Sequence, residues 1–134
     1  MSDTCAAHFI TEIDALIRRG VDLKLVNIGA QGYALVRGVP SPVPPWDRAA
    51  HDILISLPLA DSAALDGFYL ELPYGYNQAA HPRVSGQMIS YDDRQWQLVS
   101  WHYLDGQPWT PGHDDLDTHI EHCRGFFIER AARG

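Results

Sequence analysis

Short β-rich segments separated by turns fill the middle of the chain, so any fold for it must contain a sheet. The predicted strands are residues 23–28, 33–36, 52–57, 67–72 and 94–103. The first two are joined by residues 29–32, which begin and end with glycine and predict a hairpin. Side chains alternate along a strand, so Trp96, Leu98, Ser100 and His102 are expected on one face of the last segment.

Helical patterns stand on either side of these strands. The first is an apolar stripe that ends before Gly20, a residue typical of helix termini: Phe9, Ile10, Ile13, Leu16 and Ile17. The second helix is expected to begin near Asp114 and Asp115, because acidic side chains suit a helix N-terminus. Its apolar stripe is Leu116, Ile120, Cys123 and Phe127.

The order of these elements predicts an α+β fold. Consecutive strands usually pair, so we expect an antiparallel meander of four to five strands, with an N-terminal helix and a C-terminal helix packed on the sheet. Residues 40–45 hold four prolines and predict an extended loop, and residues 74–93 form a polar segment without a clear period. With 134 residues, we expect a single domain over 1–134.

Composition excludes several classes of function. The formal charge of −7 argues against nucleic-acid and anionic-membrane partners. No apolar run approaches the length of a membrane span, and the first residues lack the basic region of a signal peptide, so a cytoplasmic protein is expected. Two cysteines are too few for a disulfide scaffold or a cysteine-rich zinc module.

Several short motifs follow one another in a defined order. They are Leu57-Pro58, residues 66–70 (DGFYL), His81-Pro82-Arg83, residues 86–90 (GQMIS) and Trp109-Thr110-Pro111. In this order they resemble ubiquitin-conjugating (E2) enzymes, whose His-Pro-Asn motif precedes the catalytic cysteine and whose Trp-Ser-Pro precedes a helix. Trp96-Gln97, Ser100-Trp101-His102 and residues 109–116 resemble the prokaryotic E2 family E more closely. The resemblance covers about residues 20–130.

The resemblance implies a UBC-like fold and an E2-like carrier, a transferase, in a bacterial conjugation pathway. Such a carrier accepts the C-terminus of a ubiquitin-like protein from an E1-like adenylating enzyme and passes it to an amine of a protein target. No cofactor is implied. The resemblance also implies a setting in antiphage defence. E2 proteins meet the E1 mainly through the first helix, which makes Glu12, Arg18 and Arg19 the expected contact surface.

The resemblance also assigns roles to individual residues. Ser90 stands where E2 enzymes have the nucleophilic cysteine, and Ser85 is the alternative if the alignment gap falls elsewhere. A serine needs a base, and His102 matches the family's histidine. Ser100 would orient His102 or be the nucleophile itself, and Arg83, in place of the asparagine, would stabilise an oxyanion. The intermediate would then be an oxyester.

Some alternatives stay open at this point. The nucleophile is Ser90, Ser85 or Ser100, or is absent, and the serine in the cysteine slot is natural or engineered. Cys123 lies on an apolar stripe and is expected to be a buried core residue, and Cys5 lies near a chain end that is expected to fray. Neither is expected to be the nucleophile.

Two other functions fit the sequence. One is a catalytically inactive E2-like scaffold that binds an E1 or a ubiquitin-like protein. The other is a small metal-dependent enzyme using Asp115, His119 and His122, which follow one another at helical spacing opposite Leu116 and Ile120. The competing interpretation of these three residues is a solvated polar helix face.

Overall fold

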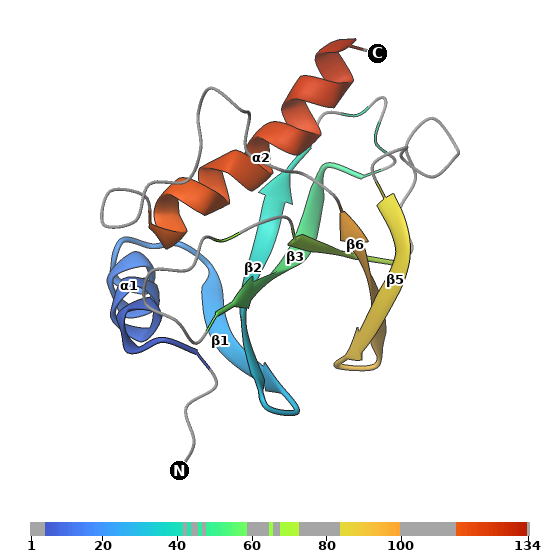
Figure 1. Ribbon diagram of the computed structural model, residues 1–134. Helices are drawn as coiled ribbons and strands as arrows, with labels where there is room; N and C mark the ends of the chain where they lie inside the picture. Colours follow the sequence, from blue (N-terminus) through green and yellow to red (C-terminus); the bar gives the residue numbers. More distant parts are fainter. Residues whose placement is uncertain are drawn as a thin grey trace.

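The computed structural model describes residues 5–41, 43, 46, 48–58, 65, 68–72, 84–99 and 115–133, with side chains for all of these except residues 84–86 and 128–133. They form two helices and six strands (Figure 1). The elements are α1 (Ala7–Arg18), β1 (Leu23–Ile28), β2 (Gln31–Pro40), β3 (Ala50–Leu57), β4 (Phe68–Glu71), β5 (Val84–Tyr91), β6 (Arg94–Val99) and α2 (Leu116–Arg133).

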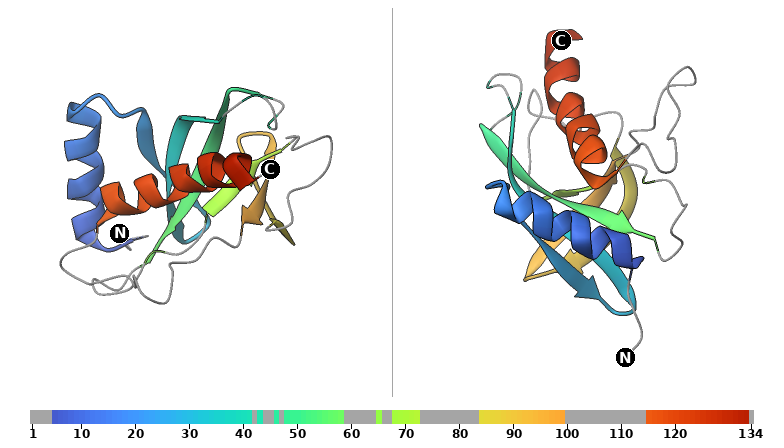
Figure 2. Two further views of the ribbon diagram at one scale, coloured as in Figure 1. Left: turned by 90° about the horizontal axis from the view of Figure 1, so that it is seen from above. Right: turned by 90° about the vertical axis from the view of Figure 1, so that its left-hand side faces the viewer.

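The strands form one curled antiparallel sheet in the order β1-β2-β3-β4-β6-β5. The β1–β2 and β5–β6 hairpins lie at its two ends (Figure 1). Seen from above, α2 crosses over the middle strands, and its first turn lies beside α1 (Figure 2). The predicted α+β class, with a helix before the sheet and a helix packed on it, is confirmed.

The prediction of four to five strands is wrong, because the described residues contain six. The additional strand, β5, lies within residues 74–93, where we expected no regular element. It also interrupts the meander, since β4 pairs with β6 and β5 lies outside β6. Glycine, serine and glutamine weaken the apolar alternation of β5, and pairing with β6 through a two-residue turn holds it in place.

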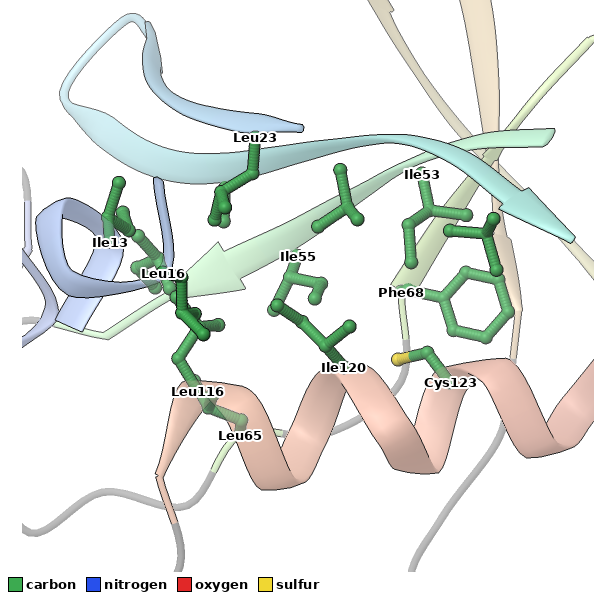
Figure 3. Packing of buried hydrophobic residues seen from close by; sticks show 14 of the residues in the cluster. Ile13, Leu16, Leu23, Ile53, Ile55, Leu65, Phe68, Leu116, Ile120 and Cys123 are labelled. Atoms are coloured by element: carbon green, nitrogen blue, oxygen red, sulfur yellow. The ribbon is translucent and has the colours of Figure 1, made fainter. Parts of the chain in front are cut away.

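The main core lies between the sheet and the two helices. Phe9, Ile13 and Leu16 of α1 are buried, as predicted. On α2 the predicted stripe is buried too, and Figure 3 shows Ile120 and Cys123 facing Ile55 and Phe68 of the sheet: Leu116, Ile120, Cys123 and Phe127. The stripe of α1 is narrower than predicted, because Ile10 and Ile17 are exposed.

Two carboxylates fix the start of α2. Asp115 accepts hydrogen bonds from the backbone N–H and the hydroxyl of Thr118, both at 2.9 Å. Glu12 of α1 accepts one from the backbone N–H of Leu116 at 2.7 Å. Unpaired N–H groups and the helix dipole make a helix N-terminus favourable for negative charge. The predicted start of this helix is confirmed, and Glu12 also joins the two helices.

A second, smaller cluster occupies the other face of the sheet. Its buried members come from strands alone: Val26, Tyr33, Leu35, Leu54 and Trp96. Tyr69, Ile89 and Tyr91 pack against them. Burial, together with the nearby Tyr69, raises the pKa of Tyr33. The curl of the sheet therefore buries apolar side chains on this face without a helix from the described part of the chain.

Candidate functional site

Ser90 lies near the end of β5 and is exposed to solvent. Its register partner on β6 is Gln95, and the Nε2 of Gln95 donates a hydrogen bond to Ser90 Oγ at 2.8 Å. Asp92 and Asp93 form the turn between the strands with φ values of 57° and 59°, the left-handed conformation that tight hairpin turns require. This turn makes Tyr91 and Arg94 the closing hydrogen-bonded pair. Ser90 and Gln95 are then the neighbouring non-hydrogen-bonded pair, whose side chains stand close together.

Ser90 lies within residues 74–93, where the sequence predicted no regular element, and the structure shows that it is a strand residue. Ile89 and Tyr91 belong to the cluster on the second face, so Ser90 projects from the opposite, helix-bearing face. A strand residue has a more fixed backbone than a loop residue. The position of its hydroxyl therefore depends on the β5–β6 register.

Of the other residues predicted for the acyl-transfer site, only Ser85 lies in the described part of the chain. Ser85 belongs to β5, but its side chain is outside the description. Arg83, Ser100 and His102 lie outside the described residues, as do the motifs at residues 81–83 and 109–111. The site that the structure describes is therefore built around Ser90 and its partner on β6.

Gln95 was not identified from the sequence. Its Nε2–H points at Ser90 Oγ, which leaves the serine hydroxyl proton available for transfer to a base. The signal was present in the run Ser90-Tyr91-Asp92-Asp93-Arg94-Gln95, because two aspartates between β-rich segments predict a two-residue turn. Such a turn places Gln95 opposite Ser90.

An open hollow of about 640 Å³ adjoins this pair. It is lined by residues from the end of β4, the β5–β6 turn, the start of β6 and the segment before β3: Arg48, Glu71, Leu72, Asp93, Arg94 and Gln95. The backbone N–H of Leu72 donates to the carbonyl of Gln95 at 2.8 Å, which ties this part of β6 to β4. Gln95 thus connects Ser90 to a hollow that carries both signs of charge.

Arg94 anchors the turn end of the hairpin to the neighbouring strands. Its Nη1 contacts Asp52 of β3 at 3.0 Å and also Glu71 of β4, and its guanidinium lies 4.7 Å from the ring centre of Trp96. Burial alone would lower the pKa of Arg94, but hydrogen bonds and charge attraction from Glu71 and Asp52 raise it overall. Arg94 is therefore a permanent positive charge that links three strands.

Neither cysteine is placed for nucleophilic chemistry. Cys123 is completely buried, as predicted, and burial raises the pKa of its thiol well above the ordinary value. A raised pKa suppresses the reactive thiolate. Cys5 is buried as well, which its place near a chain end did not indicate.

The three residues of the metal alternative do not share one environment. Asp115 is exposed and caps α2, whereas His119 is completely buried, so the expected solvated face is wrong for His119. The ring centres of His119 and His122 are 5.8 Å apart. In the part of the chain that the structure describes, no three histidine, cysteine or acidic side chains gather closely enough to hold a metal ion.

The expected E1 surface on α1 is only partly available. The side chains of Arg18 and Arg19 are 79% and 65% exposed and pair with Asp14 and Asp117. Glu12 is 22% exposed, and it binds His8 as well as the N-terminus of α2. Glu12 is therefore a structural residue, and the candidate surface is reduced to the two arginines.

Comparison with known families assigns the class of protein. The sequence model of prokaryotic E2 family E matches residues 11–129, a range that includes all six strands. A match of this extent shows an E2-like protein of the prokaryotic type. The chain belongs to the prokaryotic E2 family E, which indicates a role in ubiquitin-like conjugation.

Two further findings accompany this match. No curated protein and no solved structure is similar enough to the chain to count as a match. Among the described helices, neither has the length and apolar character needed to cross a membrane.

Proposed function

We propose that the protein is an E2-like carrier in a bacterial ubiquitin-like conjugation pathway, and that Ser90 carries the modifier as an oxyester. The observation that supports this most is the position of Ser90. The motif resemblance assigns it to the E2 cysteine slot, and in the structure it is exposed on a strand with an amide donor 2.8 Å from its oxygen, whereas both cysteines are buried. We also propose that residues 1–134 form one UBC-like domain.

The proposed reaction has two acyl transfers. Ser90 Oγ attacks the activated carbonyl carbon at the modifier's C-terminus. The C–O bond forms, the bond to the E1-bound leaving group breaks, and the hydroxyl proton passes to a base. A target amine then attacks the ester carbon, the C–N bond forms, the C–O bond breaks, and Ser90 Oγ regains a proton. His102 is the proposed base.

Gln95 has a defined place in this proposal. An oxyester is less reactive toward amines than a thioester, so the site needs donors for the negative charge of the tetrahedral intermediate. The Gln95 amide already lies at hydrogen-bond distance from the attacking oxygen. We infer that it orients Ser90 and reaches the developing oxyanion, together with Arg83.

The experiment combines the protein with its E1-like enzyme, the modifier and ATP. The adduct should survive a reducing agent, break under mild alkali, and disappear in Ser90→Ala. Ser56→Ala is the matched control, because Ser56 is an exposed serine on β3. His102→Ala should slow adduct formation by roughly 10²–10⁴, the usual contribution of a general base. Ser90→Cys should give a thioester that a reducing agent cleaves.

A catalytically inactive scaffold is the alternative, and the burial of both cysteines favours it. A scaffold would bind the E1-like enzyme or the ubiquitin-like protein without forming a covalent adduct. If no adduct forms with active partners, or if none of Ser90→Ala, Ser85→Ala and Ser100→Ala removes it, the carrier proposal fails.

We place the pathway in the cytoplasm and in antiphage defence, in keeping with a bacterial conjugation system. Neighbouring genes for an E1-like enzyme, a ubiquitin-like protein and a peptidase would support this setting. Loss of phage resistance on deletion of the gene is the direct measurement.

A further inference from the structure

The two edge strands of the sheet differ in how they are protected. At one edge, β1 contains the exposed Lys24, and α1 packs against it. Such charges and coverings keep a sheet from pairing with another chain. At the other edge, β6 is the only strand in the described part of the chain that pairs with β5.

The register shows which backbone groups of β5 face the edge. Because Tyr91 and Arg94 close the turn, Ile89 exchanges hydrogen bonds with Trp96 in the next bonded pair. The N–H and C=O groups of Met88 and Ser90 then point away from β6. The candidate nucleophile therefore lies on a strand whose alternate backbone groups face outward.

The composition of β5 favours pairing at this edge. Its eight residues, VSGQMISY, contain no charged residue and no proline. Natural edge strands usually carry charged residues, lysine above all, or proline, and these prevent association with another strand. Met88 is also 53% exposed. A strand of this kind suits the binding of an extended peptide as an additional strand.

We propose that the β5 edge binds an extended peptide segment with basic side chains, and that this segment is the C-terminal tail of the ubiquitin-like modifier. The identity of the tail rests on the proposed function. Pairing with Met88 and Ser90 would bring the end of such a tail beside Ser90 Oγ. The hydrogen bonds would be made to backbone, so the tail's sequence would matter less than its extended shape and charge.

Charge complementarity selects a basic segment. Asp92 and Asp93 are exposed at the end of β5. Arg94 pairs with Asp52 and Glu71 on the neighbouring strands and with Asp92 at 3.4 Å, so its single positive charge is shared among three carboxylates, and Asp93 adds a fourth negative charge. The hairpin therefore presents negative charge to a strand that lies along β5, in a chain whose formal charge is −7.

Hydrogen exchange of the protein alone is the first test. The amides of Met88 and Ser90 should exchange much faster than the amide of Ile89, which bonds to β6. Protection of Met88 and Ser90 that does not depend on concentration would mean that this chain covers its own edge. Protection that grows with concentration would mean that a second copy binds there. Either result overturns the proposal.

Binding is then measured with an array of short acidic, neutral and basic peptides. Basic peptides should bind best. Met88→Pro removes an outward N–H and should weaken binding by roughly tenfold, whereas Met88→Ala keeps the amide and should bind like the unaltered protein. Equal binding by these two variants, or a preference for acidic peptides, overturns the proposal.

A second variant keeps the test valid if Met88→Pro does not fold. The double variant Asp92→Asn, Asp93→Asn removes both charges and retains residues that tolerate left-handed φ. It should weaken the binding of basic peptides and leave the neutral ones unchanged. If basic peptides bind this variant as well as the unaltered protein, Asp92 and Asp93 do not select a basic segment, and the proposal that such a segment binds at the β5 edge is overturned.

The two proposals fail in different ways. Ser90→Ala should keep peptide binding and lose the covalent adduct. If Met88→Pro folds and still forms the adduct at the normal rate, the tail does not use this edge, although the carrier function stands. If basic peptides bind and no adduct ever forms, the edge proposal holds for a basic segment and the carrier function fails.

Discussion

Where α1 and α2 pack on β1, β2 and β3, apolar side chains from both layers are buried in one cluster. At the other end of the sheet, the β5–β6 hairpin leaves Ser90 and Gln95 of the same face exposed. Pairing with β4 and the ion pairs of Arg94 hold the hairpin in place. Stability is thus concentrated under the helices, and reachable polar groups are concentrated on the hairpin. Substitutions in one region should therefore change stability, and substitutions in the other should change the reactivity or binding of the exposed groups.

The largest expected effect is on stability, under α2. Ile120→Ala should lower the free energy of unfolding by about 2–5 kcal/mol, because it removes buried methyl groups and leaves a cavity. Ile17→Ala is the control, since Ile17 is 46% exposed on α1, and it should change stability by less than about 0.5 kcal/mol. Urea denaturation measures both, and similar values would contradict the assigned core.

The next effect concerns the hairpin. Arg94→Met should lower the free energy of unfolding by about 1–2 kcal/mol, because Asp52 and Glu71 lose the charge between them. This is less than for a fully buried pair, since the Arg94 side chain is 27% exposed. Arg18→Met, at an exposed pair, should cost less than about 0.5 kcal/mol. If Arg94→Met lowered the free energy of unfolding as much as Ile120→Ala, stability would not be concentrated under the helices.

Thiol labelling compares the helix-covered core with the β5–β6 hairpin directly. In the native protein, Cys5 and Cys123 should react with a thiol reagent only after local or global unfolding, because both are buried. In Ser90→Cys the new thiol should react faster by at least about 10². Rapid labelling of Cys123 in the native state would show that the α2 register is wrong.

The smallest effect on stability is expected on the outer side of α1. Replacing Arg18 and Arg19 by glutamate should weaken E1 binding, because the side chains are exposed and change sign. The melting temperature should stay nearly unchanged, since exposed ion pairs contribute little. Calorimetric titration and thermal unfolding measure the two quantities, and unaltered E1 affinity would move the interface elsewhere.

Local patterns predicted the buried half of the molecule well. The stripe on α2 was evident because buried positions recur at helical spacing, and the start of the helix was evident because acidic side chains favour a helix N-terminus. The strand β5 was missed, because pairing with β6 holds it rather than its own alternation. Gln95 was missed as a consequence, because Asp92 and Asp93 indicate a turn that pairs Gln95 with Ser90 only once β5 is recognised as a strand.

Family motifs supplied Ser90, which no composition or periodicity would have selected. The burial of His119 was not predictable, because spacing alone placed it on a polar face of α2. Which side chains are covered depends on contacts between segments distant in the sequence. The sequence could therefore indicate which residues belong to the candidate site, but not which of them lie in contact.

The bond between Glu12 and the backbone of Leu116 has a consequence for how the protein is made. The two residues are separated by 104 positions, so Glu12 can acquire this partner only after nearly the whole domain has been synthesised. Until α2 leaves the ribosome, only α1 covers this face of the sheet, and the apolar side chains that pack against α2 have no partner helix. The domain is expected to complete its fold only once α2 has been synthesised, and the nascent chain is most exposed to aggregation before that point.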